Sequence, residues 1–216
     1  MTATAIAAAH RGALALAQPV LDAVRPEHLE RPSPCADWTL ARLLEHVIGQ
    51  NHGFAQAARG RGADLAVWAD RPFGTDPAAA FAASAVELTA AFGEAAEQGL
   101  PFALPELRAG HAFPADQAIA FHFLDTLIHA WDVAVAIDAP FTCPEDLAAL
   151  LLRVAEQVPA TAGARAPGRA FAPVVEPAVV DQPITDRPTL ARPLPAAFDR
   201  ALALLGRDPA WAPVRS

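Results

Sequence analysis

Apolar residues recur with the spacing of α-helices along most of the chain. Segments of ten or more residues carry apolar side chains every three or four positions, and proline or glycine separates these segments. On this basis we predict helices over 4–24, 39–59, 77–98, 119–137, 142–158 and 196–205. Strands do not alternate with helices in the pattern. The apolar pattern therefore predicts an all-α helical bundle without a central β-sheet.

Some helix boundaries carry a recognisable signal. Thr39 is placed to cap the second helix, and Asp76 followed by Pro77 is a typical start for the third. Pro19 removes a backbone donor inside the first helix, so we expect a kink or a restart there.

The composition changes at Pro159. From there to Pro195 the chain consists largely of Pro, Ala, Gly and Arg. Proline at this density blocks both helix interiors and central strands. We therefore predict two parts: a helical bundle over 1–158, and a Pro-rich arm with a short terminal helix over 159–216, packed on the bundle.

The helix predicted over 119–137 carries short polar groups on one arc. At about 100° per residue, four of them fall within about 80° of one another: His122, Asp125, His129 and Asp132. Such an arc can simply be the solvent-exposed side of an amphipathic helix. Exposed faces, however, usually carry Arg, Glu, Lys or Gln, whereas this arc has only imidazoles and carboxylates. Asp125 and His129 are one turn apart, a spacing that lets both reach one cation.

The second predicted helix supplies a candidate third ligand, His46. Gly49 and Gly53 share its face, with Arg42 and Gln50 alongside. Two glycines inside a helix cost about 1 kcal/mol each relative to alanine, so the fold must need them. They indicate either tight helix–helix packing or empty volume beside His46.

The other histidines and Cys35 are predicted to have simpler roles. His52 points away from His46 around the helix, and three isolated histidines are expected on the surface: His10, His28 and His111. Cys35 lies in a proline-flanked loop without an adjacent base, which favours a packing role. Arg207 could turn toward an anion at a pocket mouth. We favour instead a helix stop there, with Trp211 as an apolar anchor.

Three segments, in their order and spacing, resemble a known family: SPCADWTLARLLEHVIG, DTLIHAWDVAVA and LLGRDPAW. They resemble the DinB-type four-helix bundle family, and more narrowly its metal-binding branch, which includes mycothiol-dependent maleylpyruvate isomerase. The resemblance implies an up-down-down-up bundle, to which this chain adds an extra helix and the arm. It also implies a metal held by His46, Asp125 and His129. In the isomerase the acidic ligand is typically Glu, and Asp125 is one methylene shorter.

The resemblance implies an enzyme that activates a low-molecular-weight thiol, mycothiol-like, for S-transfer or for isomerisation of a small electrophile. Two imidazoles and a carboxylate leave coordination positions open, and zinc is the favoured ion, with nickel or iron(II) as alternatives. Two other functions fit the same ligands: a hydrolase or lyase that uses bound water, and a bundle that holds metal without catalysis. Around the ligands we expect supporting or substrate-facing residues: His122, Asp132, Arg42 and Gln50.

Charge and composition limit which binding partners and which cellular location we expect. The net charge of −8 argues against nucleic acid and anionic membranes. No 18-residue uninterrupted apolar run is present, and the Ala-rich first twenty residues lack the basic region of a secretory signal. Two cysteines form neither a zinc ribbon nor a disulfide framework. We expect a cytoplasmic protein, monomeric or homodimeric, with a small-molecule substrate.

Overall fold

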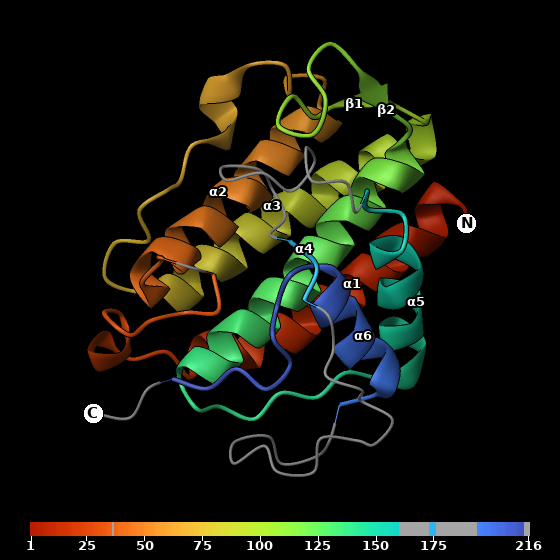
Figure 1. Ribbon diagram of the computed structural model, residues 1–216. Coiled ribbons are helices and arrows are strands. Elements are labelled where there is room, and N and C mark those ends of the chain that lie inside the picture. Colours follow the sequence, from red (N-terminus) through yellow and green to blue (C-terminus); the bar gives the residue numbers. More distant parts are fainter. Residues whose placement is uncertain (36, 160–172, 176–193, 214–216) are drawn as a thin grey trace.

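The structure is a computed structural model that describes residues 1–35, 37–159, 173–175 and 194–213. Its helices (Figure 1) are α1 Ala3–Asp22, α2 Leu40–Ala58, α3 Pro77–Gln98, α4 Ala115–Ala136, α5 Glu145–Ala155 and α6 Ala196–Leu204. The remaining elements are two 3₁₀ turns, η1 Pro26–His28 and η2 Leu65–Trp68, and a hairpin of β1 Phe102–Ala103 with β2 Ala112–Phe113. The predicted all-α bundle is confirmed. Nearly all of the predicted arm lies outside the described residues.

Helix boundaries follow the predicted chemistry in α2 and α3 but not everywhere. The side chains of Thr39 and Asp76 each accept a backbone N–H of the first turn, at 3.4 and 3.0 Å. The fourth helix starts at Ala115, one turn earlier than predicted. The first helix continues through Pro19 without a restart. Pro19 has no backbone N–H, so the helix lacks the hydrogen bond that another residue would donate there.

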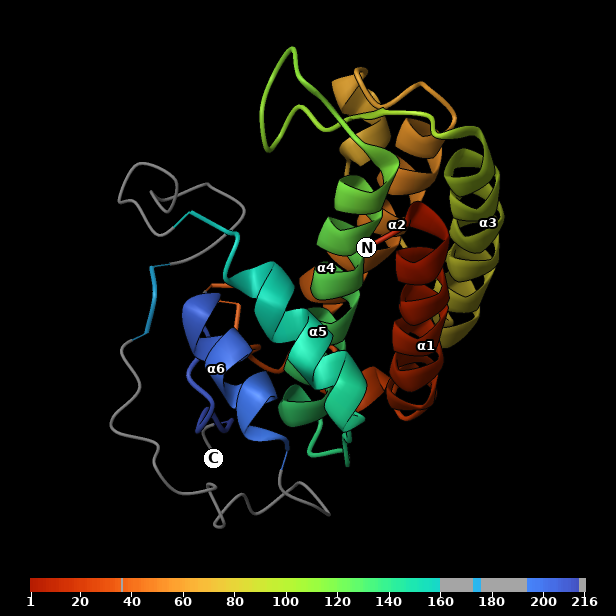
Figure 2. The same ribbon diagram turned by 90° about the vertical axis from the view of Figure 1, so that its right-hand side faces the viewer.

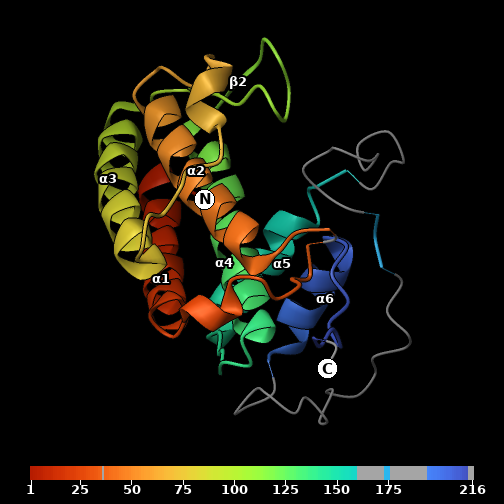
Figure 3. The same cartoon turned by 90° about the vertical axis from the view of Figure 1, so that its left-hand side faces the viewer.

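The segment between α2 and α3 runs back along α2 (Figure 3). Three contacts mark its course: Trp68 with Gly53, Asp70 with Gly49, and the Arg71 N–H donating to the Glu45 carbonyl at 3.0 Å. Residue numbers rise along the segment while those on α2 fall. Hence α3 begins beside the N-terminal end of α2, and the two helices point the same way. α1 and α4 run in the opposite direction (Figure 1), which is the up-down-down-up order.

The two glycines of α2 are explained by this segment. A Cβ at Gly49 would lie 2.6 Å from the Ala69 carbonyl oxygen, and one at Gly53 would lie 2.5 Å from Cε3 of Trp68. Trp68 is fixed in turn, because its Nε1 donates to the Gly62 carbonyl at 2.8 Å. Both earlier interpretations are therefore wrong: what lies against these glycines is neither another α-helix nor empty volume, but residues 65–71, which we call the η2 segment.

The core is built around α4. This helix packs on α1, α2, α3 and α5, while α6 packs on α5 at the side of the bundle (Figure 2). α4 is long and apolar enough to cross a membrane, but 83% of its most apolar window is buried inside the structure. Such burial is what the core helix of a soluble protein shows.

We expect Gly53→Ala to lower the free energy of unfolding by about 1–3 kcal/mol, because the added methyl would overlap the Trp68 ring. Gly93→Ala is the matched control. Gly93 also lies inside a helix, but nothing lies within 4 Å of its would-be Cβ, so alanine should stabilise by up to about 1 kcal/mol. Urea unfolding measures both changes. Equal stability of the two variants would mean that Trp68 does not pack on α2.

Candidate metal centre

The three predicted ligands meet between α2 and α4. The potential ligand atoms of His46, Asp125 and His129 all lie within 4.8 Å of one another. Nε2 of His129 is 3.3 Å from Oδ1 of Asp125. Two donor atoms on one tetrahedral zinc ion lie about 3.3–3.4 Å apart, because each is about 2.0–2.1 Å from the ion. The donor set therefore fits a single divalent cation.

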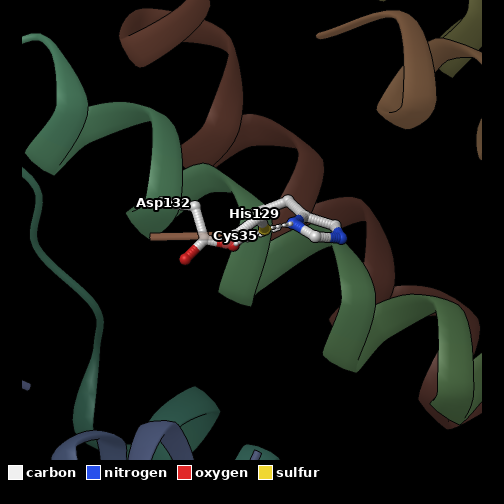
Figure 4. Close-up of side chains that lie close together, drawn as sticks. All are labelled: Cys35, His129 and Asp132. Atoms are coloured by element: carbon white, nitrogen blue, oxygen red, sulfur yellow. Dashed lines mark hydrogen bonds and ion pairs between the residues drawn. The ribbon is translucent and has the colours of Figure 1, made fainter. Parts of the chain in front are cut away.

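Each of the two histidines carries a carboxylate at its Nδ1. His129 Nδ1 is 2.9 Å from Oδ2 of Asp132 (Figure 4), and His46 Nδ1 is 3.2 Å from Oδ1 of Asp70. A carboxylate at Nδ1 favours the tautomer in which Nε2 is free to bind a cation. Asp132 was expected beside the ligands, whereas Asp70 was not expected there.

Asp125 and His129 keep each other charged. Burial by itself would raise the pKa of Asp125 and lower that of His129. Their ion pair and hydrogen bond outweigh burial, so the pKa of Asp125 lies below its ordinary value and that of His129 well above. For His46, burial and the neighbouring His129 lower the pKa, which leaves the ring neutral near pH 7. A cation that binds here must therefore displace a proton from His129.

Cys35 packs against the core, as expected, but its thiol also has polar partners that the sequence did not predict. Its thiol donates to Oδ2 of Asp132 at 3.4 Å, and its sulfur lies 4.0 Å from Nδ1 of His129 (Figure 4). Ser33 holds this loop in place, because its hydroxyl donates a hydrogen bond shared between the carbonyl oxygens of Cys35 and Trp38, at 3.2 and 3.0 Å. Cys35 thus contacts both the candidate ligand His129 and Asp132, the carboxylate that hydrogen-bonds it.

Arg207 also does more than end α6. Its Nη2 lies 3.4 Å from Oδ2 of Asp132 and 3.5 Å from the sulfur of Cys35, and its Nη1 donates to the Leu205 carbonyl at 2.9 Å. Burial by itself would raise the pKa of Asp132, but Arg207 and then His129 outweigh it and lower that pKa. Trp211 is half-buried against the core, as an anchor would be.

His122 faces the core, not a substrate, and His10 is not on the surface. Both side chains are about 1% exposed, and His122 Nδ1 lies 2.9 Å from His10 Nε2 and 3.1 Å from Oγ1 of Thr126. The ring of Phe54 packs edge-on against His122. Burial lowers the pKa of both imidazoles, to about 4 for His122, so the pair is neutral near pH 7. His10 follows Ile6 by one turn and so lies on the buried stripe of α1.

Arg42 and Gln50 lie on the flanks of the centre. The exposed Arg42 guanidinium stacks 4.6 Å over the Trp38 ring, which is itself 4.9 Å from the His46 ring. Gln50 is buried and hydrogen-bonds Glu106, a residue from the loop between β1 and β2 that the sequence did not single out. Burial raises the pKa of Glu106 against the lowering effect of the Gln50 bond.

His52 and the two remaining surface predictions agree with the structure. His52 turns toward α3, where its Nδ1 is 3.9 Å from Oε2 of Glu87. His111 is exposed and His28 partly exposed.

Residues 7–134 match the family model described as the mycothiol maleylpyruvate isomerase N-terminal domain. The chain belongs to this family. The family is DinB-like and mycothiol-related. The match spans α1 to α4 almost completely, so it includes all three candidate ligands of this chain.

Two relatives of the chain come from Mycobacterium tuberculosis: "Uncharacterized protein Rv0738" of strain ATCC 25618 / H37Rv and "Uncharacterized protein MT0763" of strain CDC 1551 / Oshkosh. Each is 35% identical over 170 residues, which cover 76% of this chain and 84% of the relative. No solved structure matches the chain.

We expect His10→Gln to weaken the acid sensitivity of the fold. As the pH falls below about 6.5, the unfolded chain binds a proton at His10 that the folded chain excludes, so the free energy of unfolding falls. Each such histidine contributes up to about 1.4 kcal/mol per pH unit, and glutamine can still donate to His122 without titrating. Urea unfolding at pH 7.5 and 5.0 measures the difference. The same pH dependence in both proteins would contradict a neutral His10.

Proposed function

We propose that this chain is a metal-dependent enzyme that activates a low-molecular-weight thiol, mycothiol-like, for S-transfer to a small electrophile or for its isomerisation. The observation that carries the proposal is the convergence of His46, Asp125 and His129 in a chain of a mycothiol-related family. The geometry supports a cation site, and the family supports the thiol as the cosubstrate.

In this proposal His46, Asp125 and His129 hold the ion. Zinc is favoured, and nickel or iron(II) suits the same two nitrogens and one oxygen. When bound, the ion lowers the pKa of a thiol that reaches it, so that the reactive thiolate forms near neutral pH. Asp125 in place of the longer Glu still supplies the negative charge that balances the cation.

The surrounding residues orient the ligands. Asp132 accepts the Nδ1–H of His129 and keeps Nε2 directed at Asp125. Arg207 keeps Asp132 ionised in its buried position, so that the carboxylate remains an acceptor. Because this support is buried, the His129 ring has little freedom to turn away from the site.

Access to the centre is asymmetric. The side chains of His46 and Asp125 are 21% and 26% exposed, whereas those of His129 and Asp132 are 7% and 0% exposed. We infer that a thiol and its electrophile approach from the side of His46 and Asp125. We further propose that the protein acts in the cytoplasm, where small thiols are kept reduced.

We expect His46→Ala and His129→Ala to lose zinc affinity by more than about 100-fold, beyond what loss of a supporting residue costs. Asp125→Asn should weaken binding sharply because it keeps the shape and loses the charge, while Asp125→Glu should preserve it. His52→Ala is the control, since it removes an imidazole from the other side of α2. Titration calorimetry of zinc into metal-free protein, with metal analysis, measures these effects. Full zinc occupancy in both alanine variants would refute the ligand assignment.

Mycothiol is expected to bind zinc-loaded protein at least about tenfold more tightly than metal-free protein, because the thiol needs the ion to ionise. S-methyl mycothiol, which has no thiol proton, is the matched control and should show no such preference. Titration calorimetry gives the affinities. Equal affinity of zinc-loaded protein for both compounds, or no binding of either, would rule out thiol activation. The remaining functions would then be a hydrolase or lyase that uses bound water, or a metal-binding bundle without catalysis.

A further inference from the structure

Asp70 reaches the candidate centre from a segment that contributes none of the ligands. Its Oδ1 lies 3.2 Å from Nδ1 of His46, while the ligands come from α2 and α4. We propose that Asp70 is a positioning residue for His46, which accepts the Nδ1–H and so leaves Nε2 as the only nitrogen that can bind a cation. The inference rests on the proposed function for the identity of that cation, but not for the hydrogen bond.

The path of the chain explains how a residue this far along the sequence arrives at His46. Gly49 lies on the same face of α2, one turn after His46, and a Cβ there would be 3.1 Å from the Asp70 Cα. On the other side of Asp70, the Arg71 N–H donates to the Glu45 carbonyl at 3.0 Å. The backbone of residue 70 is therefore held against α2 on both sides, next to His46.

The rest of the His46 surroundings restrains the plane of the ring but does not decide which ring nitrogen carries the proton. The rings of Trp38 and His129 pack edge-on against it, with centroids 4.9 and 5.5 Å away. Neither contact selects one ring nitrogen over the other. Among the described residues, the hydrogen bond that distinguishes Nδ1 from Nε2 is the one to Asp70.

The two carboxylate–histidine pairs differ in how they are held. Asp132 is fully buried and bound by Arg207, so it is fixed by its own helix and by the chain end. The Asp70 side chain is 40% exposed, and an exposed contact between a carboxylate and a histidine contributes little to stability by itself. Its geometry therefore depends on the seating of residues 68–71 on Gly49 and Gly53. This makes the η2 segment part of the metal centre and not merely a connector.

The first test is zinc affinity of the full chain by titration calorimetry. Asp70→Ala should weaken binding about 10–100-fold, the usual cost of losing a carboxylate behind a ligating histidine. Asp70→Asn should recover much of this loss because its amide oxygen still accepts the Nδ1–H. Asp64→Asn is the matched control: it makes the same charge change in the same segment and keeps an oxygen to cap Ala66. It should bind zinc like the wild type.

The second test reads the His46 ring directly and needs no metal. In metal-free protein at pH 8, nitrogen-15 NMR should show His46 protonated at Nδ1 in the wild type and at Nε2 in Asp70→Ala. Gly49→Ala should produce the same change with Asp70 still present, because the new methyl displaces the segment from α2.

The results separate this inference from the proposed function. If the wild type binds no zinc, the metal-dependent function fails, and the tautomer of His46 still decides the role of Asp70. If the wild type binds zinc but Asp70→Ala keeps both the Nδ1–H tautomer and the full affinity, the inference is overturned. Equal losses in Asp70→Ala and Asp64→Asn would also overturn it, since they would trace the effect to net charge.

Discussion

Ionised side chains inside a helical core need partners of opposite charge, and α4 carries two such groups in its buried part. Removing a charge from water costs several kcal/mol, and the cost is tolerable only when neighbours replace the lost hydration. In this protein the charges alternate in sign through the centre, from Asp125 to His129, Asp132 and Arg207. Each one stabilises the next, so the site is a single electrostatic unit and not a set of independent ligands.

These alternating charges link residues that are far apart in the sequence. Arg207 follows α6, yet its charge keeps Asp132 ionised, and Asp132 in turn orients His129. Arginine suits that position because its guanidinium stays charged even when it is buried, which lysine does not ensure. The packing of α6 on α5, beside α4, thus brings the end of the described chain into contact with the site (Figure 2).

Helices and connecting segments contribute different parts of the site. Helices place the three candidate ligands, because residues one turn apart on α4 and one residue of α2 face the same space. The connecting segments supply the groups that orient or surround them: Asp70 after η2, Cys35 in its Ser33-supported loop, and Arg207 after α6. A second buried polar pair, His10 with His122, joins α1 to α4 beside the centre, where His122 interacts electrostatically with Asp125 and His129.

The sequence by itself determined the all-α bundle and the placement of the candidate ligands. Periodicity located the helices, because it depends on residues close together in the chain, and the family resemblance of three short segments placed His46, Asp125 and His129. Only the tertiary structure decided what surrounds them. The burial of His10, the partners of Cys35 and Arg207, and the reason for Gly49 and Gly53 all arise from contacts between segments far apart in sequence. Such contacts leave no periodic signal, since they depend on how the η2 segment and the chain end fold back onto the helices.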